Sequence, residues 1–388
     1  MTFNIDFIIL NILLLYIFWK AGNNISNKGH YWNNANWCIF AFTIVQGCRF
    51  ARGNDYHAYS EIFRNGITHI ENPFFSFINE ALKTFGINEY SCFMVYAFTF
   101  VLCAMIFMSD YRKYAKYMFP FFLAGFMLFE EYMIRQAFSY SFFFLYLKQL
   151  FHLKIHKLKD IWPNIRKILY CVIIAVIIVE IHTGNIINIF VTTLIYILCK
   201  KPFSPFISIP IYVCCVYIFP NLFNFNWLSP ILNFAAETNQ RAAEYVNNSD
   251  YWFSAQGENS IYEKNVIIEI FQVIASSALM YLGHKLIKEK FTQNKVLTTM
   301  LNVFIIGLCF ESLFTNLEIL HRIGQVLDML GYFLLAIVLY YKPHKENIIQ
   351  QILYYSLIWF MYYYIKYIFF SENISMFIWD TPYTFFNI

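Results

Sequence analysis

The chain has 388 residues, of which 59% are hydrophobic and only 13% are charged, and its mean hydropathy is +0.48. These values exclude an ordinary soluble domain, because a fold of this size could not hide so much apolar surface from water. The formal net charge is only +4 and the basic residues are spread between apolar segments, so we expect no nucleic-acid partner.

Twelve apolar segments approach the roughly 20 residues that a helix needs to cross a bilayer. In chain order they are residues 3–19, 35–48, 90–109, 115–130, 134–151, 168–181, 184–199, 204–220, 265–284, 296–314, 323–341 and 348–370. The first has no basic region before it and no small-residue cleavage pattern after it, so we expect a retained span. The sequence therefore predicts an all-α polytopic membrane protein, with residues 1–388 as a single transmembrane domain.

The nine cysteines lie almost entirely inside these apolar segments, with no CxxC pair and no histidine at ligand spacing. They are typical of small buried residues rather than of a zinc site or a disulfide framework. External carboxylates do not cluster at metal-binding spacing either. We therefore expect no metal and no cofactor.

Lysines and arginines divide unequally between the two sides that alternating spans define. Nineteen of the 28 fall on one side, which the positive-inside rule identifies as the cytoplasm. Both termini then lie outside. Six of the eight arginines belong to the external minority: Arg49, Arg52, Arg64, Arg135, Arg241 and Arg322.

These external arginines need a cause besides orientation, since lysine would serve that purpose equally well. Arginine is planar and permanently charged, and it grips phosphate oxygens through two hydrogen bonds. Any single one could instead anchor a helix end among lipid headgroups. Six together favour anion binding at the outer face.

Two external loops are long enough to hold structure of their own. In the first, residues 49–89, Pro73 precedes an apolar stripe at helical spacing, which predicts an amphipathic helix whose apolar face comprises Phe74, Phe77, Ile78, Ala81, Leu82 and Phe85. In the second, residues 221–264, Ser229-Pro230 resembles a helix start. This loop carries Arg241 and many Tyr, Trp and Asn residues, which suits either sugar binding or a mobile lid.

The densest polar cluster, residues 48–59, follows the second span. Arg49 and Arg52 come just before a turn and a helix start, where free N–H groups favour anions. This pattern predicts a diphosphate cradle with the Asp55 carboxylate beside it. The alternative is a capped interfacial helix, with Asn54 or Asp55 as the cap.

Three further external turns carry Arg or His. Two acids at 130–131 come just before Arg135, and an ion pair with one of them is the alternative to anion binding there. His182 lies between the sixth and seventh spans and could move a proton near neutrality, although a lone histidine at a helix turn more often has a structural role. The third turn, His321-Arg322, opens the eleventh span.

In content and order these clusters resemble the EpsG family of Wzy-type polysaccharide polymerases. An external Arg-x-x-x-Gly-x-Asp-Tyr-x-x-Tyr motif is matched by Arg49, Gly53, Asp55, Tyr56 and Tyr59. A Glu-Pro-like element, an Arg-Gln helix start, a His-Thr turn and a late arginine follow, at Glu71-Asn72-Pro73-Phe74, Arg135-Gln136, His182-Thr183 and Arg322. The resemblance spans most of the chain. Departures at Arg52, Asn54 and Gln325 bear on acceptor specificity more than on class.

The resemblance implies a metal-independent glycosyltransferase with a GT-C-like fold. Such an enzyme joins oligosaccharide repeat units carried on undecaprenyl diphosphate at the outer face of the bacterial inner membrane. Its expected partners are the lipid-linked oligosaccharide, membrane lipid, a chain-length regulator and a flippase.

The implied site residues fall into three groups. Arg49, Arg135 and Arg322 would hold diphosphate, with Arg52 and Arg241 as helpers. The base would be His182, preferred for its pKa, or Asp55. The substrate-binding residues would be Tyr56, Tyr59, Gln136 and His321.

Two other classes stay open. A polysaccharide-lipid flippase or another exporter would also have many spans, but it should show charged residues along a mid-membrane path and two-fold repetition, and the sequence shows neither. An O-antigen-type ligase using the same donor is a closer alternative, as is an acyltransferase, which should carry an early His-Arg site on the cytoplasmic half.

Overall fold

A computed structural model of the chain describes residues 5–66, 73–153, 162–221, 265–315, 317–341, 348–370 and 376–383, and five isolated positions between 222 and 264. The described residues are almost all helical. They form two compact units, one made of residues 1–189 with 360–388 and the other of residues 190–359. The second expected external loop, including Arg241, lies largely outside the described residues.

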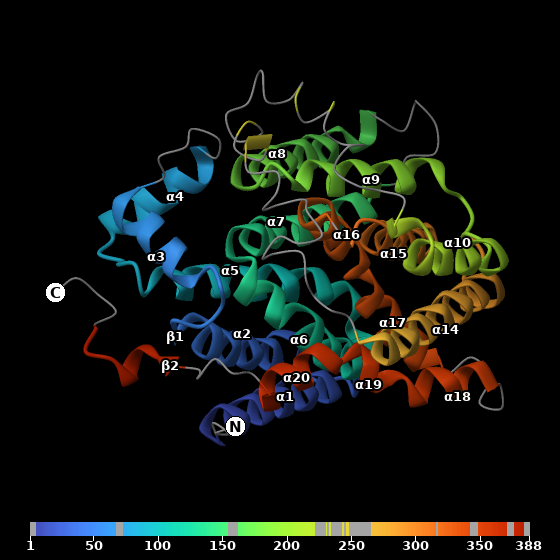
Figure 1. The fold of residues 1–388 in the computed structure, drawn as a ribbon, viewed down its shortest axis with the longest axis horizontal. Coiled ribbons are helices and arrows are strands. Elements are labelled where there is room, and N and C mark those ends of the chain that lie inside the picture. The colour runs from blue at the N-terminus through green and yellow to red at the C-terminus, as the bar shows by residue number, and fades with distance from the viewer. Residues whose placement is uncertain are drawn as a thin grey trace. The chain divides into compact units, whose positions relative to one another are not determined.

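The first unit is a bundle of helices that pack side by side (Figure 1). Its helices are α1 (Ile5–Ser26), α2 (Tyr31–Gly47), α3 (Tyr56–Asn65), α4 (Pro73–Thr84), α5 (Cys92–Met108), α6 (Ala115–Tyr132), α7 (Ile134–Phe151), α8 (Ile165–Ile181) and α20 (Tyr362–Phe370), with short 3₁₀ turns η1 (Ser109–Tyr114), η3 (Trp162–Asn164) and η5 (Ile378–Asp380). α1 packs on α2 and α6, α5 packs on α2 and α7, and α7 packs on α8. Strand β1 (Arg49–Phe50) pairs antiparallel with β2 (Met376–Phe377), so that Arg49 lies opposite Phe377.

Phenylalanine rings fill the interior of this bundle. Phe18, Phe42, Phe100 and Phe122 come from α1, α2, α5 and α6, and all four are fully buried. The ring of Phe122 stacks on those of Phe18 and Phe100 with centroids 6.3 and 6.1 Å apart. Offset aromatic packing at this spacing is favourable beyond the burial of area. The aromatic content of the sequence therefore serves the packing between helices.

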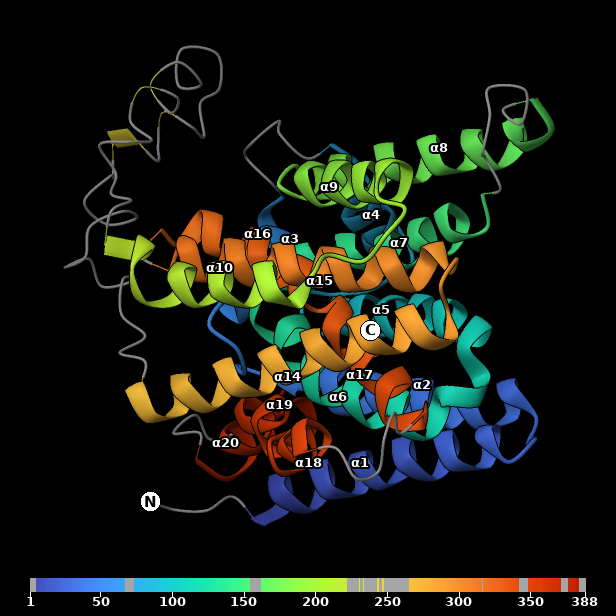
Figure 2. The same cartoon turned by 90° about the vertical axis from the view of Figure 1, so that its right-hand side faces the viewer.

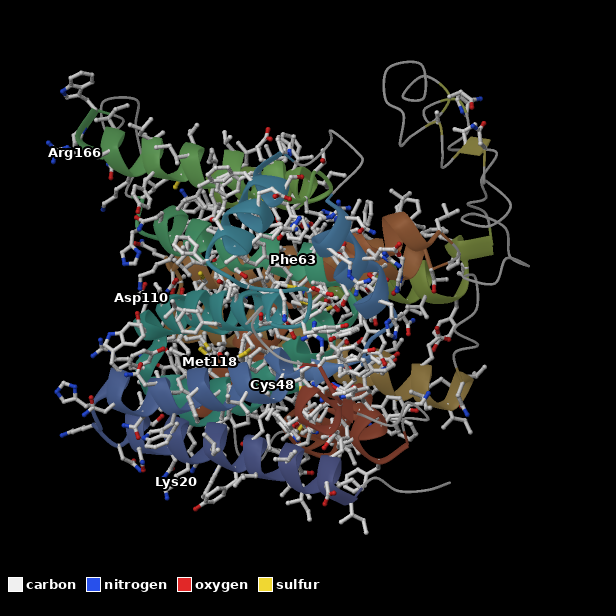
Figure 3. The ribbon with its side chains drawn as sticks, turned by 90° about the vertical axis from the view of Figure 1, so that its left-hand side faces the viewer. Lys20, Cys48, Phe63, Asp110, Met118 and Arg166 are labelled. Carbon is white, nitrogen blue, oxygen red and sulfur yellow. The ribbon has the colours of Figure 1, made fainter. Side chains whose placement is uncertain are left out.

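Short segments join α1 to α2, α5 to α6 and α6 to α7, so the ends of these helices gather at two opposite sides (Figure 3). At one side Lys148 Nζ lies 2.7 Å from Asp110 Oδ1, which ties the end of α7 to the turn between α5 and α6. Figure 3 shows Lys20, Asp110 and Arg166 displaced to the same side of Cys48, which precedes β1. The structure thus separates the basic turns from the arginine-bearing segment after α2. Which side faces the cytoplasm stays a prediction.

In the second unit, α15 (Lys295–Leu313) packs along α16 (Glu318–Asp328) and also contacts α10 (Pro205–Tyr217) (Figure 2). α14 (Val266–Lys290) packs on α17 (Leu330–Tyr341) and α18 (Ile348–Tyr355). Two helices contain the sequence positions at which the chain passes from one unit to the other. They are α9 (Asn185–Leu198) and α19 (Leu357–Phe360).

Each expected span overlaps at least one helix, but twelve spans are not confirmed. Among the residues that the structure describes, five helical segments are long and apolar enough to cross a membrane, namely 5–26, 92–132, 266–290, 295–313 and 320–341. Several others are short: the 13 residues of α10 reach only about 20 Å. The expected twelfth span is divided into α18, α19 and α20. The GT-C-like fold is likewise not confirmed, and the chain is described here as a helical, multi-pass membrane protein.

The expected first external loop, residues 49–89, holds α3 and α4, and the expected amphipathic helix coincides with α4. Its buried side comprises Phe75 and Asn79, the latter accepting a hydrogen bond from Tyr96 Oη at 2.5 Å. Phe77 and Phe85, which the sequence pattern assigned to the apolar face, are exposed. The helix was therefore predicted correctly, but its buried face is rotated toward Phe75.

Candidate functional site

The segment after α2 is forced into a tight path against its neighbours. A Cβ at Gly47 would lie 2.6 Å from Met94 Cα, so only glycine allows α2 to approach α5 this closely. Farther along, Gly53 has a φ of +90°, and a Cβ there would lie 2.5 Å from the Glu131 carbonyl oxygen. Left-handed backbone of this kind favours glycine. The turn therefore presses residues 48–53 onto the end of α6.

Arg49 is completely buried in this turn and forms an ion pair with Glu130. Its Nη1 lies 3.1 and 3.0 Å from the two Glu130 carboxylate oxygens and donates to the Gln46 carbonyl at 2.7 Å. The guanidinium carbon lies 5.1 Å from the centre of the Phe93 ring. One nitrogen thus makes all the hydrogen bonds of Arg49 that the structure defines.

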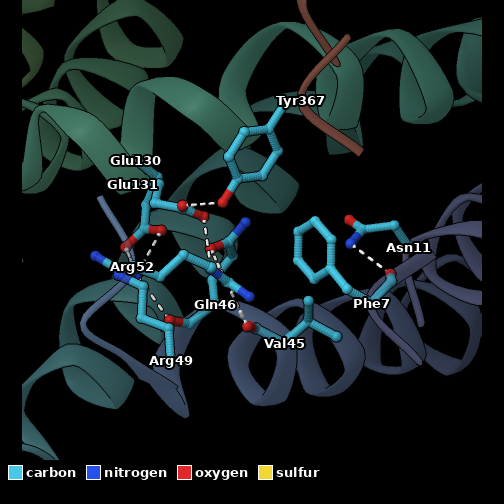
Figure 4. Close-up of polar contacts among 9 residues, drawn as sticks. All are labelled: Phe7, Asn11, Val45, Gln46, Arg49, Arg52, Glu130, Glu131 and Tyr367. Atoms are coloured by element: carbon cyan, nitrogen blue, oxygen red, sulfur yellow. Dashed lines mark hydrogen bonds and ion pairs between the residues drawn. The ribbon is translucent and has the colours of Figure 1, made fainter. Parts of the chain in front are cut away.

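Arg52 is equally buried but is held at two nitrogens (Figure 4). Nε donates to Glu131 at 3.0 Å, and Nη2 donates at 2.8 Å both to the Val45 carbonyl and to the Gln46 side-chain oxygen. Burial is the largest single influence on Arg52 and would lower its pKa, but Glu131, Tyr367 and Glu130 together outweigh it and raise that pKa. Arg52 is therefore a fixed cation.

The two guanidinium groups differ in the edge that recognises oxyanions. Nε and Nη2 form the side-on fork of arginine, which matches two oxygens of a phosphate or carboxylate. In Arg52 both of these nitrogens have protein acceptors. In Arg49 neither bonds to any residue that the structure describes. Buried donors without acceptors are costly, so the Arg49 fork is the stronger candidate for binding an anion.

Glu130 and Glu131 pair with arginines far away in sequence. From the sequence, an ion pair between Arg135 and one of these acids was the alternative to anion binding, whereas the structure pairs the two acids with Arg49 and Arg52 at 3.0 Å in each case. The end of α6 carries both carboxylates into contact with the turn after α2. Long-range packing, rather than closeness in sequence, therefore decides these two pairings.

One apolar cluster connects the arginine turn with two other expected site segments. It contains Tyr56, Phe93, Ile134 and Ile181, all buried together. The rings of Tyr56 and Phe93 stack with centroids 4.4 Å apart, and Phe93 also lies against Arg49. Ile134 and Ile181 are the residues just before Arg135 and His182. The start of α7 and the end of α8 therefore meet the arginine turn around a shared core.

The expected residues on these segments differ in environment. Gln136 is buried, whereas Asp55, Tyr59 and His182 are half-buried. Asp55 stands before α3 but its side chain does not cap that helix, contrary to the capping alternative. His182 follows the last residue of α8 in extended backbone. The catalytic and substrate-binding roles of these residues stay predictions.

Hydrogen bonds fix the neighbourhood of His182. Ser139 Oγ of α7 donates to the Ile178 carbonyl of α8 at 2.8 Å and accepts from Asn185 Nδ2 at 2.8 Å. All three of these residues are buried. They lock the turn that carries His182 to α7. The sequence analysis did not single out Ser139, since its partner lies 39 residues away.

In the second unit, His321 and Arg322 lie on α16 against α15. A Cβ at Gly324 would lie 2.3 Å from the Glu311 backbone nitrogen, so this glycine permits very close packing of the two helices. His321 Nδ1 lies 3.0 Å from the Glu311 carbonyl oxygen, and its Nε2 lies 3.0 Å from Gln325 Nε2. Both ring nitrogens are thus held by protein groups. The substrate-binding role expected for His321 is untested.

These features define a multi-pass membrane protein with a buried arginine–glutamate cluster at one side of its first unit. The model of the EpsG family matches residues 34–385, which is most of the chain. The chain therefore belongs to the EpsG family, a family of Wzy-like polysaccharide polymerases. No match was found among curated proteins or among solved structures.

Proposed function

We propose that the chain polymerises oligosaccharide repeat units carried on undecaprenyl diphosphate, at the outer face of the cytoplasmic membrane. The hydroxyl of one repeat unit attacks the anomeric carbon of another, the bond from that carbon to the diphosphate oxygen breaks, and undecaprenyl diphosphate leaves with the electron pair. Family membership supports a polymerase in general. The 19-to-9 division of basic residues supports the external face.

The geometry of Arg49 is the main structural support for diphosphate binding, which family membership alone does not assign to any residue. The Arg49 fork offers two parallel N–H donors from a buried cation, and a diphosphate offers matching anionic oxygens. Glu130 holds the third nitrogen, which fixes the direction of the fork. Preorganised donors of this kind stabilise the charge that develops on a leaving group. Because Arg49 is covered in this structure, donor binding requires a neighbouring side chain to move.

The other expected site residues are given supporting roles in this reaction. Arg135 and Arg322 are half-buried and remain diphosphate ligands, while Arg52 serves to hold the turn. His182 or Asp55 takes the proton of the attacking hydroxyl. Arginines in place of a divalent cation make the proposed reaction metal-independent. Expected partners besides the lipid-linked donor are a flippase and a chain-length regulator.

Deletion of the gene, with analysis of lipid-linked glycans, tests this function. Loss of a polymerase leaves single repeat units on undecaprenyl diphosphate at the outer face, and long chains disappear. Loss of a ligase instead leaves long chains on the lipid. Loss of a flippase leaves single units on the cytoplasmic side. Either of the last two results would overturn the proposal.

A further inference from the structure

The C-terminal segment of the chain returns to the arginine cluster, although nothing in its sequence marks it as part of a site. Tyr367 of α20 is buried, and its hydroxyl donates to Glu131 Oε1 (Figure 4). The two residues are 236 positions apart. The opposite oxygen of the same carboxylate accepts from Arg52. Glu131 is thus held from two sides, by α20 and by the turn after α2.

Hydrogen bonds link Tyr367 to Arg49 in steps that pass through Gln46, whose side chain binds Arg52 and whose backbone carbonyl binds Arg49. Glu131 binds Arg52, Arg52 Nη2 donates to the Gln46 side chain, and the Gln46 carbonyl accepts from Arg49 Nη1. The five residues come from α20, α6, the turn, α2 and β1. In the low dielectric of a protein interior, linked hydrogen bonds polarise one another, so a change at one member alters the strength of the next. A change at Tyr367 is therefore expected to alter the position of the Arg49 guanidinium.

A second route runs through the backbone. β2 pairs with β1 so that Phe377 lies opposite Arg49, and the Ile378 amide donates to the Cys48 carbonyl at 2.9 Å. The ring of Phe377 also lies 5.4 Å from the guanidinium carbon of Arg52. The C-terminal segment thus contacts both arginines, at the backbone of one and at the side chain of the other.

We propose that Tyr367 is a positioning residue of the diphosphate site, acting through Glu131 and Arg52 on the fork of Arg49. This inference rests on the proposed function, since it assigns the anion at the fork as the lipid diphosphate. Phe377 of the same segment supports the same turn. In this view α20 and β2 are part of the donor site.

The test compares two tyrosines of α20 that differ in what their hydroxyls hold. Tyr364 is buried like Tyr367, but its hydroxyl donates to the Asn11 backbone carbonyl at 3.3 Å. Tyr367→Phe and Tyr364→Phe are therefore the same chemical change on the same helix. The probe is undecaprenyl diphosphate, bound to purified full-length protein in lipid nanodiscs. Kd and melting temperature are measured for each variant.

Tyr367→Phe is expected to raise the Kd about tenfold, because Glu131 loses one of its hydrogen bonds. Tyr364→Phe should leave the Kd within about twofold of the parent. A merely structural role of Tyr367 would instead lower the melting temperature and leave the Kd of the folded protein unchanged. Should Tyr367→Phe fail to fold, Phe377→Leu keeps the apolar volume and is expected to raise the Kd about threefold.

Arg49→Ala separates this inference from the proposed function. If Arg49→Ala abolishes diphosphate binding while Tyr367→Phe and Phe377→Leu leave it unchanged, the positioning role is wrong and the donor site stands. If Arg49→Ala also binds the probe normally, the diphosphate site itself is misassigned. Weakened binding in both Arg49→Ala and Tyr367→Phe, with normal binding in Tyr364→Phe, supports the inference.

Discussion

Arg52 Nε donates to Glu131 Oε2 at 3.0 Å, and neither side chain has any exposed surface. Removing one partner of a buried ion pair leaves the other charge uncompensated, which typically destabilises a protein by about 3–5 kcal/mol. We therefore expect Glu131→Ala to lower the melting temperature of the purified protein strongly. Glu80→Ala is the matched control, since Glu80 forms an exposed pair with Lys83. Exposed pairs contribute little. Similar melting temperatures for the two variants would contradict the structural role of Arg52.

The fork of Arg49 leads to a prediction about binding rather than stability. Lysine keeps the charge beside Glu130 but loses the two parallel donors, so Arg49→Lys should fold normally and bind the lipid diphosphate more weakly. Arg49→Ala should cost about 2–4 kcal/mol of transition-state stabilisation, by analogy with loss of one oxyanion donor. Polymerisation rates of purified variants measure this effect. Arg64→Lys, which alters an exposed pair with Glu89, is the control.

A normal rate for correctly inserted Arg49→Ala would favour helix anchoring over anion binding. The same comparison distinguishes Arg49 from Arg52. Because both side-on nitrogens of Arg52 already bond to protein groups, Arg52→Lys should reduce stability more than it reduces donor affinity.

The apolar pattern predicted the helices of this chain well because each helix is specified by local sequence. The amphipathic helix at Pro73–Thr84 followed from helical spacing alone. Breaks inside helical stretches were missed, as at Met329 between α16 and α17, since apolar residues continue across the break. The length of an apolar run also overestimated the length of the helix within it. The run 204–220, for example, contains a helix of only 13 residues.

The arginine cluster could be predicted only in part. Arg49 and Arg52 stood out as charges at the mouth of an apolar span, and so did Glu130 and Glu131. Their pairing joins residues 79 to 81 positions apart, and no local pattern specifies it. Tyr367 gave no signal at all, since one tyrosine among 30 in an aromatic-rich chain is unremarkable until the fold brings it to Glu131.

The side of the membrane that each loop faces can be tested by labelling. Single cysteines near Asp55 and Asn247, in a background without the nine native cysteines, should react with an impermeant thiol reagent in intact cells. A cysteine near Lys157 should not, since the basic residues place that turn in the cytoplasm. Labelling near Lys157 together with protection of the other two positions would invert the topology and remove the external donor site.

Divalent cations should be unnecessary for turnover. The reaction as proposed neutralises the leaving diphosphate with arginines, so added EDTA should leave the polymerisation rate in proteoliposomes unchanged. The control is a metal-dependent glycosyltransferase assayed in the same lipid. A rate that falls with EDTA and returns with Mg²⁺ or Mn²⁺ would count directly against the arginine mechanism.

The base is tested by separating catalysis from donor binding. His182 is half-buried at the end of α8, and the bonds among Ser139, Ile178 and Asn185 fix its turn independently of its ring. His182→Ala should therefore fold normally, bind undecaprenyl diphosphate with unchanged affinity, and lose turnover by about 10²–10⁴-fold, the usual contribution of a general base. Asp55→Asn is the competing variant. Histidine and aspartate side chains lose their protons in different pH ranges, so the acid limb of the rate profile separates the two. If Asp55→Asn loses turnover while His182→Ala retains it, the base is Asp55, and the turn of His182 serves only to join α8 to α7.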